Sequence, residues 1–188
     1  VMELRTAMHD FRAAGKKLAC HTEDASNATY LVLSACETIG LAPLGQIAVT
    51  GPAAMPIHVK PLLDKLGVTA DFLHVGAYKG AAEPLTRDAP SEEMKETLGA
   101  ILDRHYDTMV EVIAEERELE PAGVKSLIDQ ALFPSPAAKT AKLVDEVASW
   151  ETFRDKVVTG PWAELDDEGK PQGNAAKDQL GSMLKLML

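Results

Sequence analysis

The sequence predicts an α/β fold in which a mostly parallel sheet is flanked by helices. Short apolar runs of strand length alternate with helical segments through the first half of the chain, and a long amphipathic helix follows near residue 100. Alternation of this kind is typical of parallel sheets, because two parallel strands need a long crossover connection, usually a helix. In such folds functional residues collect at the ends of the strands.

The composition supports a globular domain and argues against several classes of function. The chain has 188 residues, of which 46% are hydrophobic and 26% are charged, as is ordinary for folded proteins. A formal net charge of −10 argues against nucleic-acid binding and against a basic membrane-surface patch, since both need clustered Lys and Arg. No nucleotide-binding glycine signature is present, and we expect no cofactor.

The N-terminal region is predicted to form a helix, a buried strand and a second helix. Apolar residues recur at helical spacing over 2–11, so the chain begins inside a helix and we expect it to be a fragment of a longer protein. Residues 18–22 are short and apolar, as in a buried strand. Asp24 or Ser26 is placed to cap a helix that runs to about Ala35.

Two further strands are expected at 38–41 and 46–50. Pro43 and Gly45 lie between them, and both residues favour a turn. We therefore predict two separate strands at this point.

The next predicted elements are a helix and a strand that lead into a loop. The helix covers 56–67, and Pro61 within it implies either a late start or a kink. Residues 69–75 alternate between apolar and polar side chains, which predicts a strand. The strand ends at Gly76.

The second half of the chain is predicted to be mainly helical. We expect a long helix from Ser91 to Glu118, a helix at 121–133, a short helix with an apolar segment at 134–147, and a helix at 150–158. Beyond Gly160 the composition shifts to Asp, Glu, Gly, Pro, Gln and Asn, as in a linker. We place one domain at 1–159, and a linker with the start of a following segment at 160–188.

Lys79 is the main candidate for a reactive side chain. It follows Tyr78 in the loop after the last predicted strand, small residues come after it, and no acidic residue lies within three positions. A partly desolvated lysine favours the neutral amine, which a general base near neutral pH requires. The alternative interpretation is an ordinary solvated loop lysine. Glu83 and Arg87 either tie the loop down by an ion pair or are two solvated charges.

Other polar residues are interpreted as structural. Cys20 and Cys36 lie in apolar stretches without CxxC spacing, so we expect buried thiols. The histidines do not reach a ligand spacing such as HExxH, so we expect no metal site; they include His21, His58, His74 and His105. The glutamates of the long helix are expected to form a solvated face: Glu111, Glu115, Glu116, Glu118 and Glu120.

Three stretches carry a family resemblance. They are LLDKLGV at 62–68, GAYKGAAEP at 76–84 and AKLVDEV at 141–147. Together they resemble the bacterial serine-lysine signal peptide peptidases, also called protease IV or SppA, over about Gly15 to Phe153. The middle stretch is the most specific, because its whole frame is followed by Arg-Asp and a capped helix.

The resemblance implies a fold, a chemistry and a location. It implies a ClpP/crotonase-like fold, assembly into a homo-oligomeric ring, and serine peptidase action on hydrophobic signal peptides at the periplasmic face of the bacterial inner membrane. It also implies that Lys79 is the general base of a Ser/Lys dyad, in which a neutral lysine takes the proton of the serine hydroxyl.

The serine of that dyad has two candidates. Ser26 precedes Lys79 by 53 residues, as the resemblance requires, but Asn27 and Ala28 follow it where the family has two glycines. This departure resembles the N-terminal half of two-domain members, in which a C-terminal domain supplies the serine. On that interpretation Ser26 is a relic or only a helix cap. A competing hypothesis is that the isolated chain is a structural and oligomerisation module without activity of its own. An acyl-CoA enzyme of the crotonase type is disfavoured, because paired catalytic carboxylates are missing from matching loops.

Overall fold

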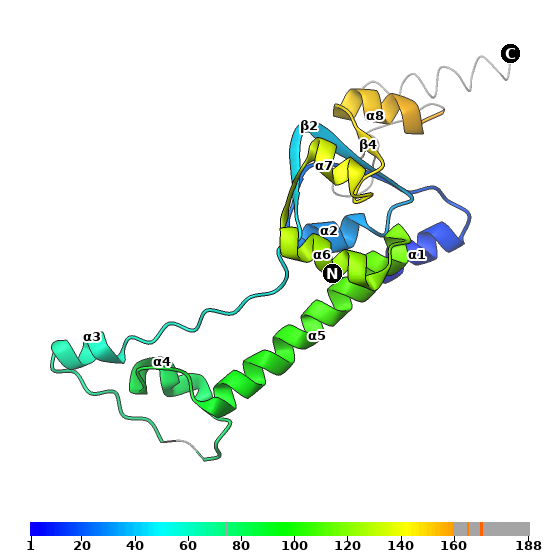
Figure 1. Cartoon of the computed structure of the whole chain (residues 1–188). Coiled ribbons are helices and arrows are strands. Elements are labelled where there is room, and N and C mark those ends of the chain that lie inside the picture. Colours follow the sequence, from blue (N-terminus) through cyan, green and yellow to red (C-terminus); the bar gives the residue numbers. More distant parts are fainter. Residues whose placement is uncertain (74, 160–164, 166–169, 171–188) are drawn as a thin grey trace, which may run out of the picture.

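The computed structural model describes residues 1–73, 75–159, 165 and 170 (Figure 1). Its elements are α1 (Met2–Ala13), β1 (Ala19–Ala25), α2 (Asn27–Leu33), β2 (Thr38–Ala48), α3 (Lys60–Lys65), the 3-10 helix η1 (Gly80–Ala82), α4 (Glu83–Thr86), α5 (Glu92–Arg117), α6 (Pro121–Gln130), β3 (Leu132–Pro134), α7 (Ser135–Thr140), β4 (Glu146–Val147) and α8 (Trp150–Val157). The predicted linker at 160–188 lies outside the described residues, apart from Leu165 and Lys170.

Strand β2 is the centre of the sheet. It pairs in parallel with β1 and β4, and antiparallel with the short β3. Helices flank this mostly parallel sheet (Figure 1). The predicted fold class is therefore confirmed, and the architecture is consistent with the ClpP/crotonase-like fold that the resemblance implies.

The prediction of two strands at 38–41 and 46–50 was wrong, because β2 is one strand. The register passes from Thr22 opposite Leu41 to Asp24 opposite Gln46, so the residues between form a bulge instead of a connecting turn. A Cβ at Gly45 would collide with the carbonyl oxygen of Glu23. Pro43 and Gly45 therefore bend the strand but do not end it.

The two faces of the sheet are covered by different helices. Ile39 and Leu41 are fully buried and belong to the main core cluster, which also contains residues of α2, α5 and α6. Gly40 lies between them and faces the other way, since side chains alternate along a strand. A Cβ at Gly40 would stand 2.5 Å from the Phe153 ring, so this glycine lets α8 approach the opposite face.

Helix α1 is attached to α5 by a buried ion pair. The Arg5 guanidinium lies 2.6 Å from Glu116 Oε1, and the two side chains are only 6% and 11% exposed. Arg5 also donates to Ser34 Oγ at 2.7 Å and to the Leu31 carbonyl. The prediction of a wholly solvated acidic face was thus wrong at Glu116.

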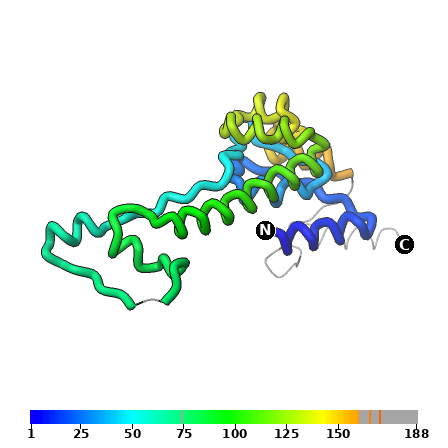
Figure 2. The backbone as a smooth tube through the Cα atoms, turned by 60° about the horizontal axis from the view of Figure 1, so that its bottom comes forward, coloured from blue at the N-terminus to red at the C-terminus, as the bar shows by residue number. Residues whose placement is uncertain are grey.

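A long arm, residues 52–104, extends from the sheet. The buried residues of α5 all lie between Met109 and Ile113, so the first half of this helix leaves the core. An extended segment leads out to α3, and α4 and α5 lead back (Figures 1 and 2). Near the far end, hydrogen bonds join the outgoing segment to the returning one. Val59 N donates to the Pro84 carbonyl (2.7 Å), and His58 Nδ1 donates to the Arg87 carbonyl (3.0 Å).

Two predictions for the arm were wrong. Residues 69–73 and Val75 form no strand, because this segment lies on the arm, away from the strands with which it would have to pair. The helix expected from Pro56 begins only at Lys60, with Pro61 in its first turn. Of the two alternatives for Pro61, the late start is therefore confirmed.

The prediction of free, buried thiols was also wrong. Cys20 and Cys36 form a disulfide, with Cα atoms 5.9 Å apart, and are not free thiols. Ala19 pairs with Thr38, so the start of β1 lies beside the segment that enters β2. The spacing of 16 residues carried no recognisable motif, and only the strand pairing reveals that the two side chains meet.

Candidate active site

Lys79 lies in the loop between a glycine turn and η1. Gly76 has a φ of 101°, a conformation that residues with a side chain rarely adopt, and its carbonyl accepts a hydrogen bond from Lys79 N at 3.3 Å. Lys79 is the N-cap residue of η1, and its side chain is exposed in this chain. The described residues of this chain therefore do not bury the Lys79 side chain, as its predicted desolvation would require.

The loop is held against the first turns of α5. The Tyr78 hydroxyl donates to Glu96 Oε2 at 2.8 Å. A Cβ at Gly80 would lie 3.0 Å from Met94 Cε, so the backbone beside Lys79 packs closely on α5. Tyr78 thus contacts α5 through its hydroxyl, in addition to standing next to the lysine.

Glu83 makes the third contact between the loop and α5. It is only 8% exposed, and its carboxylate accepts hydrogen bonds from the Ser91 hydroxyl (2.5 Å) and the Ser91 backbone N–H (2.8 Å). These two bonds lower the pKa of Glu83 below its ordinary value. Both alternatives for Glu83 are therefore wrong, since it forms no ion pair with Arg87 and is not a solvated charge. The Arg87 side chain is exposed.

Ser91 caps α5 in the predicted way. Its Oγ accepts a hydrogen bond from Met94 N at 3.1 Å. In a capping box a Glu or Gln at the third helical position accepts the N–H of the cap residue, but here that position is Met94. Glu83 takes this role from eight residues upstream. The missing acceptor at Met94 was the sequence signal that could have revealed the partnership.

Ser26 is the N-cap residue of α2, directly after β1. Its side chain is exposed and makes no capping hydrogen bond, and its Oγ lies 3.3 Å from Thr29 Oγ1. Asn27 occupies the place of the first family glycine. Its Nδ2 donates to the Gly51 carbonyl at 2.9 Å, and its Oδ1 is buried without a hydrogen-bond partner.

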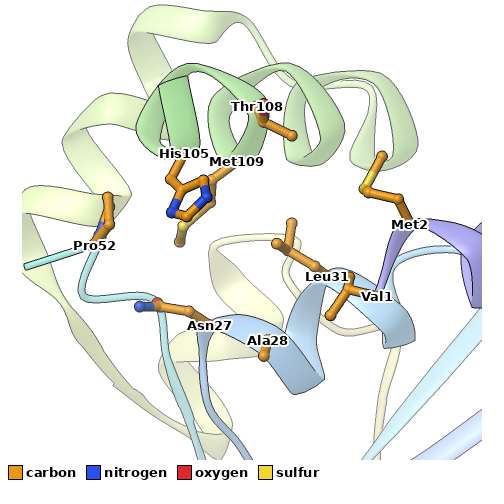
Figure 3. Close-up of a pocket in the computed structure, with 9 residues that line it drawn as sticks. All are labelled: Val1, Met2, Asn27, Ala28, Leu31, Pro52, His105, Thr108 and Met109. Atoms are coloured by element: carbon orange, nitrogen blue, oxygen red, sulfur yellow. The ribbon is translucent and has the colours of Figure 1, made fainter. Parts of the chain in front are cut away.

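An apolar cavity of about 330 Å³ lies beside the start of α2 (Figure 3). Asn27, Ala28 and Leu31 line it from α2, and α1 and α5 close other sides; the further lining residues are Val1, Met2, Pro52, His105, Thr108 and Met109. The cavity thus adjoins the helix that Ser26 caps. Its size suits a small apolar group.

The structure does not bring Ser26 and Lys79 together within this chain. The Lys79 loop packs on Met94 through Gly80, whereas α2 shares its cavity with His105. Met94 and His105 are separated on α5 by eleven residues, about 17 Å at 1.5 Å per residue. Figure 1 shows α4 beside the start of α5 and α2 beside its second half.

The histidines considered as ligands serve structural contacts. His21 Nε2 donates to the Ala148 carbonyl at 2.9 Å, and its ring packs near Phe153. His58 donates to the Arg87 carbonyl and so links the outgoing and returning segments of the arm. His74 lies outside the described residues. Over the described part of the chain, no cluster of three or more His, Cys, Asp or Glu side chains is arranged to hold a metal ion. None of the helices described is both long and apolar enough to cross a bilayer.

Comparison with known proteins identifies the family. The sequence profile of Peptidase family S49 matches residues 10–163. "Protease 4" of Salmonella typhi is 31% identical over 153 residues, which are 76% of this chain and 24% of that protein. "Protease 4" of Haemophilus influenzae is 30% identical over 61% of this chain and 18% of its own length.

A shorter relative agrees with this assignment. The "Putative signal peptide peptidase SppA" of Enterococcus faecium is 32% identical over 54% of this chain and 29% of its own length. The chain therefore spans between about a fifth and a third of the length of these curated relatives. The match of the profile to most of the sequence shows that the chain belongs to peptidase family S49.

Proposed function

We propose that this chain is the lysine-bearing domain of a serine peptidase that cleaves signal peptides or other short hydrophobic peptides. Lys79 is the general base of a Ser/Lys dyad in this proposal. The names of the relatives, "Protease 4" and "signal peptide peptidase", support peptidase chemistry. The motif around Lys79 supports the choice of base.

The proposed reaction needs only a serine and a neutral lysine. The Lys79 amine takes the proton of the serine hydroxyl while Oγ attacks the peptide carbonyl carbon. The resulting ammonium then gives this proton to the leaving amine, and an acyl-enzyme remains. Water hydrolyses the ester after Lys79 has taken one of its protons, which regenerates both side chains.

The observation that carries the proposal is the position of Lys79 on the arm. The side chain is exposed in this chain and stands far from Ser26 along α5. A lysine at the end of an arm can be buried by, and can act on, a second domain or a second copy. Such burial also supplies the desolvation that a general base requires.

The serine is then provided by one of two sources. A C-terminal domain of the same protein is the first, and Ser26 of a neighbouring copy is the second. Asn27 and Ala28 favour the first source, because their side chains occupy space that two glycines leave open for backbone and substrate. Asn27 is also committed to hydrogen bonds with Thr50 and Gly51, which follow β2.

The proposed substrate is hydrophobic. The cavity beside α2 is lined mainly by apolar side chains and suits an apolar side chain of a peptide. This lining supports a substrate peptide that contains apolar residues.

Assembly into a homo-oligomeric ring is part of the proposal. The arm exposes a series of large apolar side chains, namely Met55, Ile57, Leu62, Leu66, Phe72, Leu73 and Val75. Exposed apolar surface of this extent marks interaction sites. A neighbouring copy is the proposed occupant, since it would also cover Lys79.

The proposed location is the periplasmic face of the bacterial inner membrane. The Cys20–Cys36 disulfide supports it, because disulfides persist in oxidising compartments such as the periplasm and are rare in the cytosol.

The alternative is a catalytically inactive half that serves structure and oligomerisation. The exposed Lys79 and the glycine-free neighbourhood of Ser26 favour it for the isolated chain. Reconstitution separates the two functions: the chain alone, a serine-bearing C-terminal domain alone, and their mixture are assayed for hydrolysis of a hydrophobic fluorogenic peptide. The favoured source of the serine gives activity only in the mixture, whereas activity of the chain alone would identify Ser26 of a neighbouring copy. Activity of the serine-bearing domain alone would refute the proposal.

A further inference from the structure

We propose that Glu83 is a positioning residue for Lys79, acting through Ser91. The inference deepens the proposed function and rests on the role of Lys79 as base. Glu83 and Lys79 stand at the two ends of η1, which is only three residues long. Contacts that hold Glu83 in place therefore also restrict the position of Lys79, because a single helical turn joins the two residues.

The contact between Glu83 and Ser91 is suited to fix this point. One carboxylate oxygen accepts the Ser91 hydroxyl at 2.5 Å and the other accepts the Ser91 backbone N–H at 2.8 Å, so the two bonds define the orientation of the group. Glu83 and Ser91 are both buried, and hydrogen bonds to a charged acceptor are roughly twice as strong as neutral ones. Few other contacts of the loop are buried in this way.

The partner of Glu83 is itself held in place. Ser91 begins α5, and its Oγ accepts a hydrogen bond from Met94 N. The same helix has its last turns in the core, where Met109 and Ile113 are buried. Glu83, Ser91 and α5 thus connect the proposed base to the core of the domain.

Two further contacts keep the loop against the same turns of α5. Gly80 packs on Met94, and the Tyr78 hydroxyl donates to Glu96. Tyr78 is exposed, so its bond competes with water and fixes the loop less than the buried pair does. Loss of Glu83 would leave Lys79 attached mainly by exposed contacts.

The expected consequence is a loss of rate with little change in binding. A displacement of about 1 Å of a catalytic group costs about 100-fold in rate, because the reacting atoms must be close and aligned. Both carboxylate oxygens of Glu83 are occupied by Ser91, so we assign Glu83 no direct contact with the peptide. Its removal should therefore lower kcat and leave KM nearly unchanged.

The test combines backbone hydrogen exchange with kinetics. Glu83→Ala and Glu83→Gln are compared with wild type in this chain by exchange mass spectrometry, and in the reconstituted peptidase by kcat and KM. We expect faster exchange in peptides covering 76–91 in Glu83→Ala, unchanged exchange in the sheet, and kcat lowered by about 10- to 100-fold. Glu83→Gln keeps one acceptor for Ser91 and should recover part of both effects.

The matched control is Glu92→Gln. Glu92 lies one residue after Ser91 and is exposed, and its carboxylate pairs with Lys95 on the same helix. This variant changes the charge of the same turn without touching the loop. It should leave both exchange and kcat as in wild type.

Each failure has its own signature. Unchanged exchange at 76–91 in Glu83→Ala would overturn the inference, whatever the kinetics. Faster exchange with a wild-type kcat would reduce Glu83 to a structural role. Full activity in Lys79→Ala would instead refute the proposed function. The two failures can be distinguished because they are measured in different variants.

Discussion

Lys79 lies beside the first turn of helix α5, whereas Ser26 caps α2, which shares a cavity with His105 eleven positions further along α5. A proton cannot pass directly between side chains so far apart. A dyad that uses Lys79 must therefore take its serine from another domain or another copy.

The first prediction concerns Ser26. Ser26→Ala in the assembled peptidase should keep kcat/KM within about twofold of wild type, because the serine is an exposed cap residue that makes no capping bond. Steady-state hydrolysis of a fluorogenic peptide measures this. A loss of about 1,000-fold or more would instead identify Ser26 of a neighbouring copy as the nucleophile.

The second prediction concerns the arm as a subunit contact. Burial of a leucine or valine side chain contributes about 1.5–3 kcal/mol, so Leu73→Glu or Val75→Glu should weaken self-association by about 10- to 150-fold. Analytical ultracentrifugation over a range of concentrations measures the constant. Leu44→Glu is the matched control, since Leu44 is equally exposed but lies on the bulge of β2. Equal behaviour of the arm variants and the control would exclude the arm as the contact.

The third prediction concerns the disulfide. A cross-link that closes a loop of about 15 residues stabilises a protein by about 3 kcal/mol, chiefly through the unfolded state. Its sequence separation is 16, so Cys20→Ser/Cys36→Ser should lower the Tm by about 6–12 °C. Differential scanning calorimetry with and without reductant measures this. Reductant should have no effect on the double variant, and a wild-type Tm in that variant would contradict the prediction.

The fourth prediction concerns the attachment of α1. Arg5→Ala removes the closest partner of Glu116, which keeps His9 and Arg12 nearby, and should lower the free energy of unfolding by about 1.5–3 kcal/mol. Arg12→Ala should cost about 1 kcal/mol or less, because Arg12 is more exposed and lies 3.6 Å from Glu116. Urea denaturation followed by circular dichroism compares the two. Equal losses would show that the burial of the Arg5 pair does not matter.

Strand β1, parts of β2 and most of the helices could be predicted from hydrophobic periodicity, but β3 begins within the segment 121–133 that was predicted as a helix. The cap at Ser91 and the long helix α5 follow directly from residue type and spacing, and Ser26 takes the N-cap position of α2 without a capping hydrogen bond. The pattern failed where long-range pairing decides the structure. Pro43 and Gly45 are turn residues by composition, but pairing with β1 on both sides keeps β2 continuous.

The arm was the least predictable region for a related physical reason. Residues 69–75 alternate as a strand does, yet a strand needs a neighbour and the arm provides none. Lys79 could be singled out from its neighbours in the sequence. Its exposure, the Glu83–Ser91 contact and the distance from Ser26 depend on how α5 directs the arm, which local sequence does not encode.

Replacement of Lys79 tests the central claim most directly. Lys79→Ala in the assembled peptidase should lower kcat by about 100- to 10,000-fold while the fold is retained, because a general base contributes this much to the rate. Lys65→Ala, at another exposed lysine of the arm, should keep wild-type kcat. Full peptidase activity in Lys79→Ala, measured under the same conditions, would contradict the assignment of Lys79 as the base.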